Sequence, residues 1–279
     1  MTEGFADRKL IGVNGAVVVA CLGAAVFALF AGGASAQTAG SKHDLGTAGG
    51  AQQKTDLTTE VCVFCHTPHG SDTSASAPLW NKNLAQPGGG YQRYSTLNTS
   101  TLDGDEAPVG SVSLACLSCH DGTQAMDVLI NAPGQDGYTA GGAQFDPAAI
   151  STMTGTPIPN LGTDLRNDHP ISIQYAGGGC STTDTACTNL GDKDFVTPAT
   201  DLINNVQQWW VNTTATGSTT GREKTDMILY TRSDGPSGLT EPFVECASCH
   251  DPHEATVQPV SFMRISNQNS AVCLACHSK

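Results

Sequence analysis

Positive charge is scarce in this sequence, which has 13 lysines and arginines against 26 aspartates and glutamates and a formal net charge of −13 at pH 7. A protein that binds nucleic acid through its phosphates needs a basic face. The charge balance therefore excludes nucleic acid as a partner. It favours an exposed, soluble surface or a partner protein that is basic.

Apolar residues are also few. They make up 39% of the chain, and 31 glycines and 14 prolines interrupt it. This is a small supply for a hydrophobic core, so regular structure should be sparse. Residues 123–240 are rich in Gly, Thr, Asn and Asp and contain short β-like runs, such as 126–130 and 227–230. We therefore expect a mostly irregular chain with short helices and a few short β-strands.

Long apolar runs are absent except at residues 11–30. Basic residues at 8–9 precede this run, and an Ala-Ser-Ala cleavage site follows at 34–36. The pattern predicts a secretory signal peptide over residues 1–36 and an exported protein. Because the run is rather long for a signal, an uncleaved membrane anchor is the alternative. A lipoprotein signal at Cys21 is disfavoured, since the residues after it stay apolar.

What the sequence does contain repeatedly is one cysteine motif. The pattern Cys-x-x-Cys-His occurs four times and is the attachment sequence of c-type haem, with the histidine as an axial iron ligand. Two zinc sites are the alternative, but zinc does not require a histidine after every second cysteine. The predicted attachment residues are Cys62, Cys65, Cys116, Cys119, Cys246, Cys249, Cys273 and Cys276, and the proximal ligands are His66, His120, His250 and His277.

Two of the motifs carry a second histidine three residues after the first. His69 follows His66, and His253 follows His250, each with a proline in between. The second histidine is too close along the chain to reach the far face of the ring that its neighbour ligates. We therefore expect His69 and His253 to bind haems other than the one attached beside them.

The histidine count supports this interpretation. The chain has eight histidines, and four haems with two histidines each need eight. Bis-histidine ligation is therefore predicted throughout, which leaves no iron with an open position for an enzymatic reaction. The methionines at 126, 153, 227 and 263 are alternative sixth ligands, but we interpret them as packing residues. The predicted distal ligands are His43, His69, His169 and His253.

Two further cysteines, Cys180 and Cys187, lie outside the motifs and the predicted signal. In an exported protein a disulfide between them is expected, and two free thiols are the alternative.

The order of the motifs indicates a duplication. Each half reads as a motif with a second histidine followed by a plain motif, which predicts two two-haem units separated by an insertion. We expect an N-terminal arm and two-haem unit at 37–122, an insertion with a distal histidine and the disulfide at 123–240, and a C-terminal two-haem unit at 241–279. The fold would be organised around a stack of four haems.

Several segments resemble the tetrahaem extracellular cytochromes of the OmcE type. They cover the haem-bearing parts of the chain, whereas the insertion is matched only at His169. The resemblance implies filaments with a continuous haem stack inside, in which a neighbouring subunit supplies one distal histidine. The matching segments are 41–44, 61–70, 77–81, 167–170, 244–253, 262–267 and 273–277.

His43 is the predicted ligand between subunits. It lies seven residues after the predicted cleavage site, on an extended arm with little to anchor it. The arm would reach the haem at Cys273 and Cys276 of the next subunit. Such a head-to-tail contact does not close on itself and generates a filament. The alternative is that His43 folds back onto a haem of its own chain.

Two functions fit these features, and neither is enzymatic. The first is a subunit of an extracellular filament that takes electrons from upstream cytochromes and conducts them along the haems to an extracellular acceptor. The second is a soluble periplasmic tetrahaem carrier that serves a reductase. Both use the same haem chemistry, so assembly alone separates them.

The motif and histidine counts give a first test. The intact mass of the mature protein should exceed that of its polypeptide by four haems, and the reduced protein should not bind carbon monoxide readily. A high-spin iron in the native spectrum would contradict the balanced count.

Overall fold

The structure is a computed structural model, and it describes Met1 and residues 38–84, 87–134, 137–155, 159–213, 221–255 and 262–278. The chain forms two compact units, Met1–Ala36 and Gln37–Lys279. The predicted signal peptide, apart from Met1, lies outside the described residues. Within the described residues, no helix has both the length and the hydropathy needed to span a membrane.

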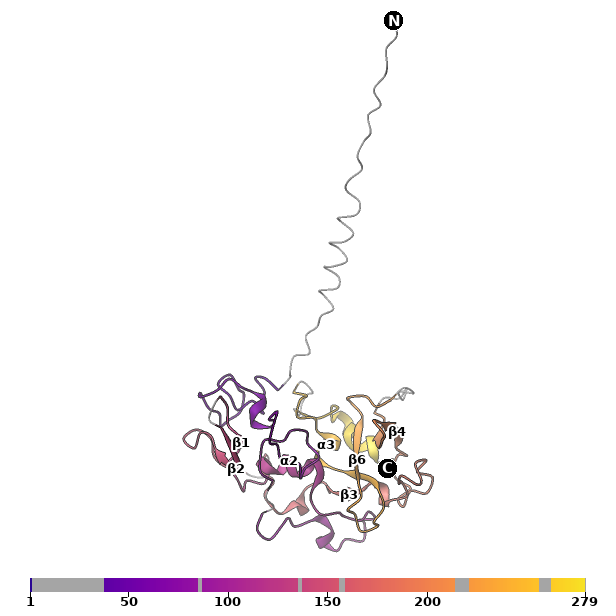
Figure 1. The fold of residues 1–279 in the computed structure, drawn as a ribbon. Coiled ribbons are helices and arrows are strands. Elements are labelled where there is room, and N and C mark those ends of the chain that lie inside the picture. The colour runs from indigo at the N-terminus through magenta and orange to yellow at the C-terminus, as the bar shows by residue number, and fades with distance from the viewer. Residues whose placement is uncertain are drawn as a thin grey trace. The chain divides into compact units, whose positions relative to one another are not determined.

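A five-stranded antiparallel sheet is the largest element of the second unit. Its strand order is β3-β7-β6-β5-β4, and a separate antiparallel pair joins β1 to β2. Apart from β7, these strands lie in the segment predicted as the insertion (Figure 1). The strands are β1 (Val128–Asn131), β2 (Tyr138–Gln144), β3 (Ile173–Gln174), β4 (Ala199–Ile203), β5 (Val206–Val211), β6 (Met227–Arg232) and β7 (Glu241–Val244).

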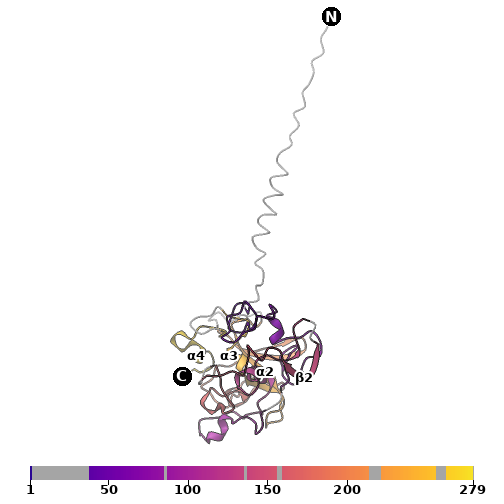
Figure 2. The ribbon, with the colours of Figure 1, turned by 90° about the vertical axis from the view of Figure 1, so that its left-hand side faces the viewer.

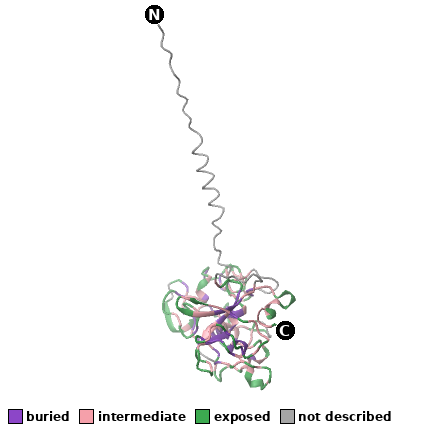
Figure 3. Ribbon diagram, turned by 90° about the vertical axis from the view of Figure 1, so that its right-hand side faces the viewer, coloured by how far each residue is buried: buried purple, intermediate pink, exposed green. Residues whose placement is uncertain are grey.

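The central strands β5 and β6 form the main core. Trp209, Val211, Met227 and Leu229 are fully buried, because the apolar side chains of the paired strands face the same interior. Trp210, next to Trp209, is buried as well. Figure 3 shows the buried residues in the middle of this unit and the exposed ones in loops at its edge. The same core packs against part-buried residues of the third and fourth cysteine motifs, including Cys249 and Cys276.

Cys180 and Cys187 are joined by a disulfide, with their Cα atoms 4.4 Å apart. Both are buried in the sheet core, beside Tyr175 and Leu190. Closing so short a loop stabilises the fold by roughly 2.5 kcal/mol on the chain-entropy account. The disulfide therefore fixes a glycine-rich segment that has little other regular structure.

Each cysteine motif begins in a helical turn. The spacing of three residues places both cysteines on one face of a helix, from which both thiols can reach one ligand. In Figures 1 and 2 alike, α2 lies between α3 and β2. The motif helices are η1 (Cys62–Phe64), α2 (Ser111–His120), α3 (Cys246–Cys249) and α4 (Ala271–Cys276), and further short 3-10 helices are η2 (Tyr94–Leu97), η3 (Leu165–Asn167), η4 (Tyr175–Gly177) and η5 (Gln268–Ser270).

The prediction of a mostly irregular chain with short helices and strands is confirmed, although the sheet is larger than expected. The prediction of an unanchored N-terminal arm is wrong. The buried Asp44 carboxylate accepts hydrogen bonds from the backbone N–H groups of Gly40 (2.8 Å) and Gly46 (3.0 Å), which closes a turn around it. Further along, the Thr55 hydroxyl donates to Asp146 (2.6 Å).

A buried ion pair connects the second and third motifs. Glu245, which precedes α3, is fully buried and pairs with Arg232 at 2.8 Å. The Ser113 hydroxyl of α2 donates to the same carboxylate and accepts from the backbone N–H of Cys246 (2.9 Å). Because α2 and α3 each carry attachment cysteines, this cluster fixes the two haem-attachment turns relative to each other.

Replacing Glu245 with alanine leaves Arg232 buried without its main counter-charge. We expect the free energy of unfolding to fall by about 3–5 kcal/mol, measured by denaturant unfolding of the haem-loaded protein. Asp234 is the matched control, because it pairs with the same arginine at 2.7 Å but its side chain is 58% exposed. Asp234→Asn should cost no more than about 1 kcal/mol. Equal losses for the two variants would contradict the role assigned to Glu245.

Candidate haem-binding site

Three of the four motifs are closed by the same backbone arrangement, which we call the clip. In the first motif, the Cys65 carbonyl accepts from the Asn81 N–H (2.9 Å), and the Thr67 N–H donates to the Leu79 carbonyl (2.8 Å). His66 lies between these bonds, in an isolated β-bridge with Trp80. The helical turn thus ends in one residue pair of antiparallel sheet, which sets the direction of the histidine.

The third and fourth motifs repeat this pattern with segments from elsewhere in the chain. In the third, the Arg264 N–H donates to the Cys249 carbonyl (2.9 Å) and the Asp251 N–H to Phe262 (2.8 Å). In the fourth, Val196 donates to Cys276 and Ser278 to Asp194, both at 2.8 Å. The second motif differs, because the His120 carbonyl accepts from Leu161 (2.7 Å).

The residue opposite each clipped histidine is large and apolar. Trp80 meets the His66 ring edge-on, with the ring centroids 5.9 Å apart, and the Phe195 ring lies 4.3 Å from that of His277. Met263 holds the same position opposite His250. Bridge partners point to the same side of the chain, so Met263 lies beside the proximal histidine rather than across the iron from it. This placement favours packing over ligation.

The four motifs follow one another in space in their sequence order. The Cys116 and Cys246 side chains share a hydrogen bond, which together with burial raises the pKa of Cys116. Burial, with a contribution from Cys119, raises the pKa of Cys65 to about 12. Burial, with a contribution from Cys249, raises that of Cys276 to about 12. The attachment points therefore form one continuous line from the first motif to the fourth.

These raised pKa values describe protonated thiols at neutral pH. A catalytic cysteine needs the opposite, a pKa lowered by a helix N-terminus or a neighbouring cation. No group of three or more His, Cys, Asp or Glu side chains in the described ranges converges as a metal site would. Cys246 differs from the thiols named above, because its hydrogen bond with the Cys116 thiol lowers its pKa.

Two pairs of histidines face each other at one common spacing. The rings of His66 and His253 have centroids 6.1 Å apart, and those of His43 and His120 are also 6.1 Å apart. A metal binds imidazole nitrogen at about 2.0–2.1 Å, and the ring centre lies about 1.1 Å behind that nitrogen. Two axial imidazoles on one iron therefore have centroids about 6.2 Å apart. The observed spacing fits a bis-histidine iron.

Backbone carbonyls fix the orientation of several histidine rings. The Nδ1 atom of His66 lies 2.8 Å from the Pro78 carbonyl, that of His120 is 2.9 Å from Pro159, and that of His169 is 3.0 Å from Pro170. A carbonyl can only accept, so Nδ1 carries the proton and Nε2 of the neutral ring has its lone pair available. This is the outer-shell arrangement typical of metal-binding histidines.

Burial keeps two candidate distal ligands, His43 and His169, and the proximal ligand His250 neutral. It lowers the pKa of His43 to about 4, with His120 adding to the effect. Burial also lowers the pKa of His169, with a contribution from His277, and that of His250, with a contribution from His120. The neutral imidazole is the form that binds a metal.

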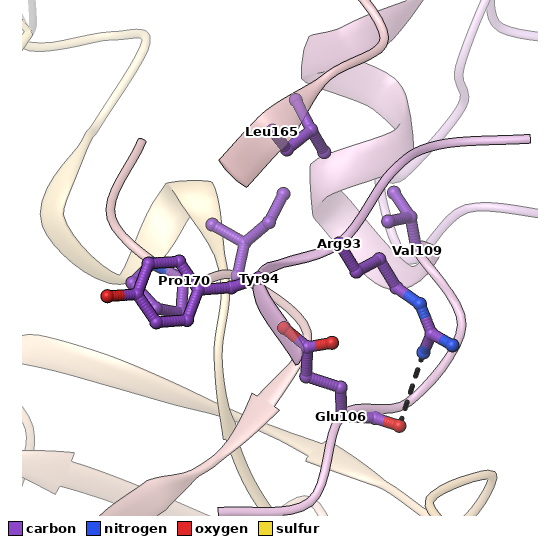
Figure 4. A pocket seen from close by; sticks show the side chains of 7 residues that line it. Arg93, Tyr94, Glu106, Val109, Leu165 and Pro170 are labelled. Carbon is purple, nitrogen blue, oxygen red and sulfur yellow. Dashed lines mark hydrogen bonds between the residues drawn. The ribbon is translucent and has the colours of Figure 1, made fainter. Parts of the chain in front are cut away.

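A small cavity lies beside the loop that carries His169. Tyr94, Leu165 and Pro170 are among the residues that line this cavity, and Arg93 crosses it to donate to the Glu106 carbonyl at 3.3 Å (Figure 4). Its volume of about 10 Å³ is that of roughly one water molecule. The cavity is too small for an organic substrate.

The structure thus brings together His66 with His253 and His43 with His120, and it places His277 close enough to His169 to lower its pKa. It does not bring His69 to His250. The His69 side chain is exposed, and its backbone carbonyl is held by Thr67 and Asn131. His43 also stacks on Phe262 of its own chain, with the ring centroids 4.0 Å apart.

The sequence analysis did not identify Phe195 or the carbonyls of Pro78 and Pro159, and it named Met263 only as a packing residue. Phe195 lies 82 positions before its partner His277, so no local pattern marks it. Pro78 and Pro159 are 12 and 39 positions from the histidines that they contact, so no short-range pattern marks them. Their carbonyls acquire a function only once the chain folds back on the rings.

The geometry defines a haem-binding electron-transfer protein. Haem c, when bound, supplies an iron that exchanges one electron between its ferric and ferrous states. A family model described as a doubled CXXCH motif matches residues 241–279, which hold the third and fourth motifs. A search of the curated proteins found no match. The doubled motif indicates a multihaem c-type cytochrome.

Replacing His253 with alanine should affect the haem at Cys62 and Cys65, because the lost ring faces His66. We expect one high-spin signal in the spectrum of the oxidised protein. The Trp80 indole resonance should shift with it, since this ring contacts His66. His69→Ala is the control and should leave the Trp80 resonance in place. A change confined to the haem at Cys246 and Cys249 would contradict the pairing.

Proposed function

We propose that this chain is an exported tetrahaem c-type cytochrome that forms an extracellular filament and conducts electrons along stacked bis-histidine haems. The observation that carries the proposal is the line of four attachment motifs flanked by facing histidine rings. Neighbouring motifs share contacts between their cysteines, so haems attached there would lie close enough for electrons to pass from one to the next. The signal-like residues 1–36 support export.

The histidine geometry supports a definite ligand assignment. His253 would complete the haem of Cys62 and Cys65 opposite His66, and His43 would complete that of Cys116 and Cys119 opposite His120. His169 would serve the terminal haem opposite His277. The two histidines left over are His250, proximal to the haem of Cys246 and Cys249, and the exposed His69.

Because His69 has no haem of its own chain to ligate in this assignment, we propose His69 as the ligand between subunits, in place of His43. An exposed histidine beside one end of the haem line can serve the His250 haem of a neighbouring chain. Such a contact joins different surfaces of two copies and does not close, so it propagates into a filament. The resemblance of the haem-bearing segments to the OmcE type supports the same assembly.

A soluble periplasmic carrier is the second candidate. The contacts of His43 with His120 and Phe262 of its own chain support the carrier, because the sequence analysis proposed the filament on a His43 that ligates a haem of another subunit. The net charge of −13 would also suit brief, electrostatically steered encounters with a basic partner. In either case the expected donors are other cytochromes, and the acceptors lie outside the cytoplasm.

The His69→Ala variant separates the two candidates. The filament proposal predicts monomers in which one haem has lost its second histidine, and electron microscopy of the secreted material should show no filaments. His43→Ala is the matched control. It should disturb the haem at Cys116 and Cys119 but still allow filaments to form. Filaments of normal length from His69→Ala would overturn the subunit contact, and wild-type material that stays monomeric would favour the carrier.

A further inference from the structure

Two buried cations accompany the haem-attachment motifs. Lys82 is fully buried, and its Nζ donates to the carbonyls of Met126 (2.8 Å) and Val128 (3.1 Å). Arg264 is 8% exposed and donates to the carbonyls of Ala247 (3.1 Å) and Lys224 (2.9 Å). Burying a charge without a counter-charge is costly, so lysine and arginine are rarely found in this state.

Neither cation has a carboxylate within ion-pair distance among the described residues. Asp127, which stands in sequence between the two residues whose carbonyls hold Lys82, is fully buried; its Oδ2 accepts from the Asp146 N–H (2.6 Å), and neither of its oxygens pairs with Lys82. The nearest acidic group along the chain to Cys246 is Glu245, and its charge is balanced by Arg232 at 2.8 Å. Neither Lys82 nor Arg264 is therefore neutralised by a direct ion pair among the described residues.

Both cations sit at a clip of a motif with a second histidine. Lys82 directly follows Asn81, whose N–H binds the Cys65 carbonyl, and Arg264 itself binds the Cys249 carbonyl. Both positive charges act on the attachment thiols. Burial raises the pKa of Cys65 and of Cys249, and the charges of Lys82 and Arg264, respectively, partly offset this rise. The clip of the fourth motif has Val196 and Thr197 at these positions. At the second motif, the residue that donates to the His120 carbonyl is Leu161, and Gly162 follows it.

Lys82 is held in place by its neighbour. The buried Asn81 side chain donates to the Val63 carbonyl (2.6 Å) and the Asn131 carbonyl (2.8 Å), and its oxygen accepts from the Asn131 N–H (2.8 Å). These bonds connect the clip to β1, and Lys82, the next residue, is fully buried. The ammonium is therefore a fixed charge at the first motif.

We infer that Lys82 and Arg264 raise the reduction potentials of the haems at Cys62/Cys65 and Cys246/Cys249 above those of the haems at Cys116/Cys119 and Cys273/Cys276. Reduction removes one positive charge from the iron, so a nearby buried cation favours the ferrous state. Because the motifs follow one another in sequence order, higher and lower potentials alternate along the line. The inference rests on the proposed haem loading but not on filament formation.

The test is a spectroelectrochemical titration of the haem-loaded protein and its Lys82→Met and Arg264→Met variants. Each substitution should move one of the four transitions to lower potential, with about a tenfold change in the reduction equilibrium of that haem, or about 59 mV for one electron. Lys82→Arg and Arg264→Lys keep the charge and should retain the native potentials. Unchanged transitions, or an equal shift of all four, would overturn the inference.

Lys54→Met is the matched control. Its Nζ also binds two backbone carbonyls, those of Thr47 (3.3 Å) and Gly49 (3.2 Å), but it is exposed. Water screens its charge, so the potentials should not move.

The wild-type protein supplies a measurement that needs no variant to fold. Trp80 contacts His66, so its indole resonance reports the haem of the first motif during the titration. That haem should be among the two reduced at the higher potentials. Reduction among the last two would overturn the inference, whereas a wild-type protein without haem would instead refute the proposed function.

Discussion

The clip that closes three of the cysteine motifs is the constraint on which the rest of the structure depends. A helical turn places two thiols on one face, and one residue pair of antiparallel sheet then turns the following histidine back toward them. The Asn81, Arg264 and Val196 N–H groups that complete this contact come from different parts of the chain. The clips therefore tie otherwise irregular segments to the attachment points and make the motifs the organising centres of the fold.

The larger sheet has a supporting role. Its core around Trp209 and Met227 packs against the third and fourth motifs, and Arg232 of β6 reaches the buried Glu245 that joins α2 to α3. A chain with so few apolar residues thus concentrates them behind the attachment turns. Fixing these turns matters for electron transfer, because it keeps distances and orientations constant while the iron changes charge.

Local patterns predicted the attachment residues and the partnership of Cys180 with Cys187, because each depends on short spacing. The three-residue spacing also predicted that His253 binds a haem other than the one attached beside it, but not that it lies opposite His66. Contacts over long separations did not follow. The folding back of His43 depends on Asp44 and Thr55, whose hydrogen bonds no periodicity marks, and the clip partner Phe195 lies in a segment without any motif. The burial of Lys82 could not be predicted from the sequence either, since lysine is normally exposed.

The account centres on pairs of histidines that lie far apart in sequence and face each other across an iron. A density map of the haem-loaded protein, from crystals or from electron cryomicroscopy, tests this most directly. The account predicts an iron between the Nε2 atoms of His66 and His253 and another between those of His43 and His120. An iron held by His66 with a water or with any ligand other than His253 would contradict it.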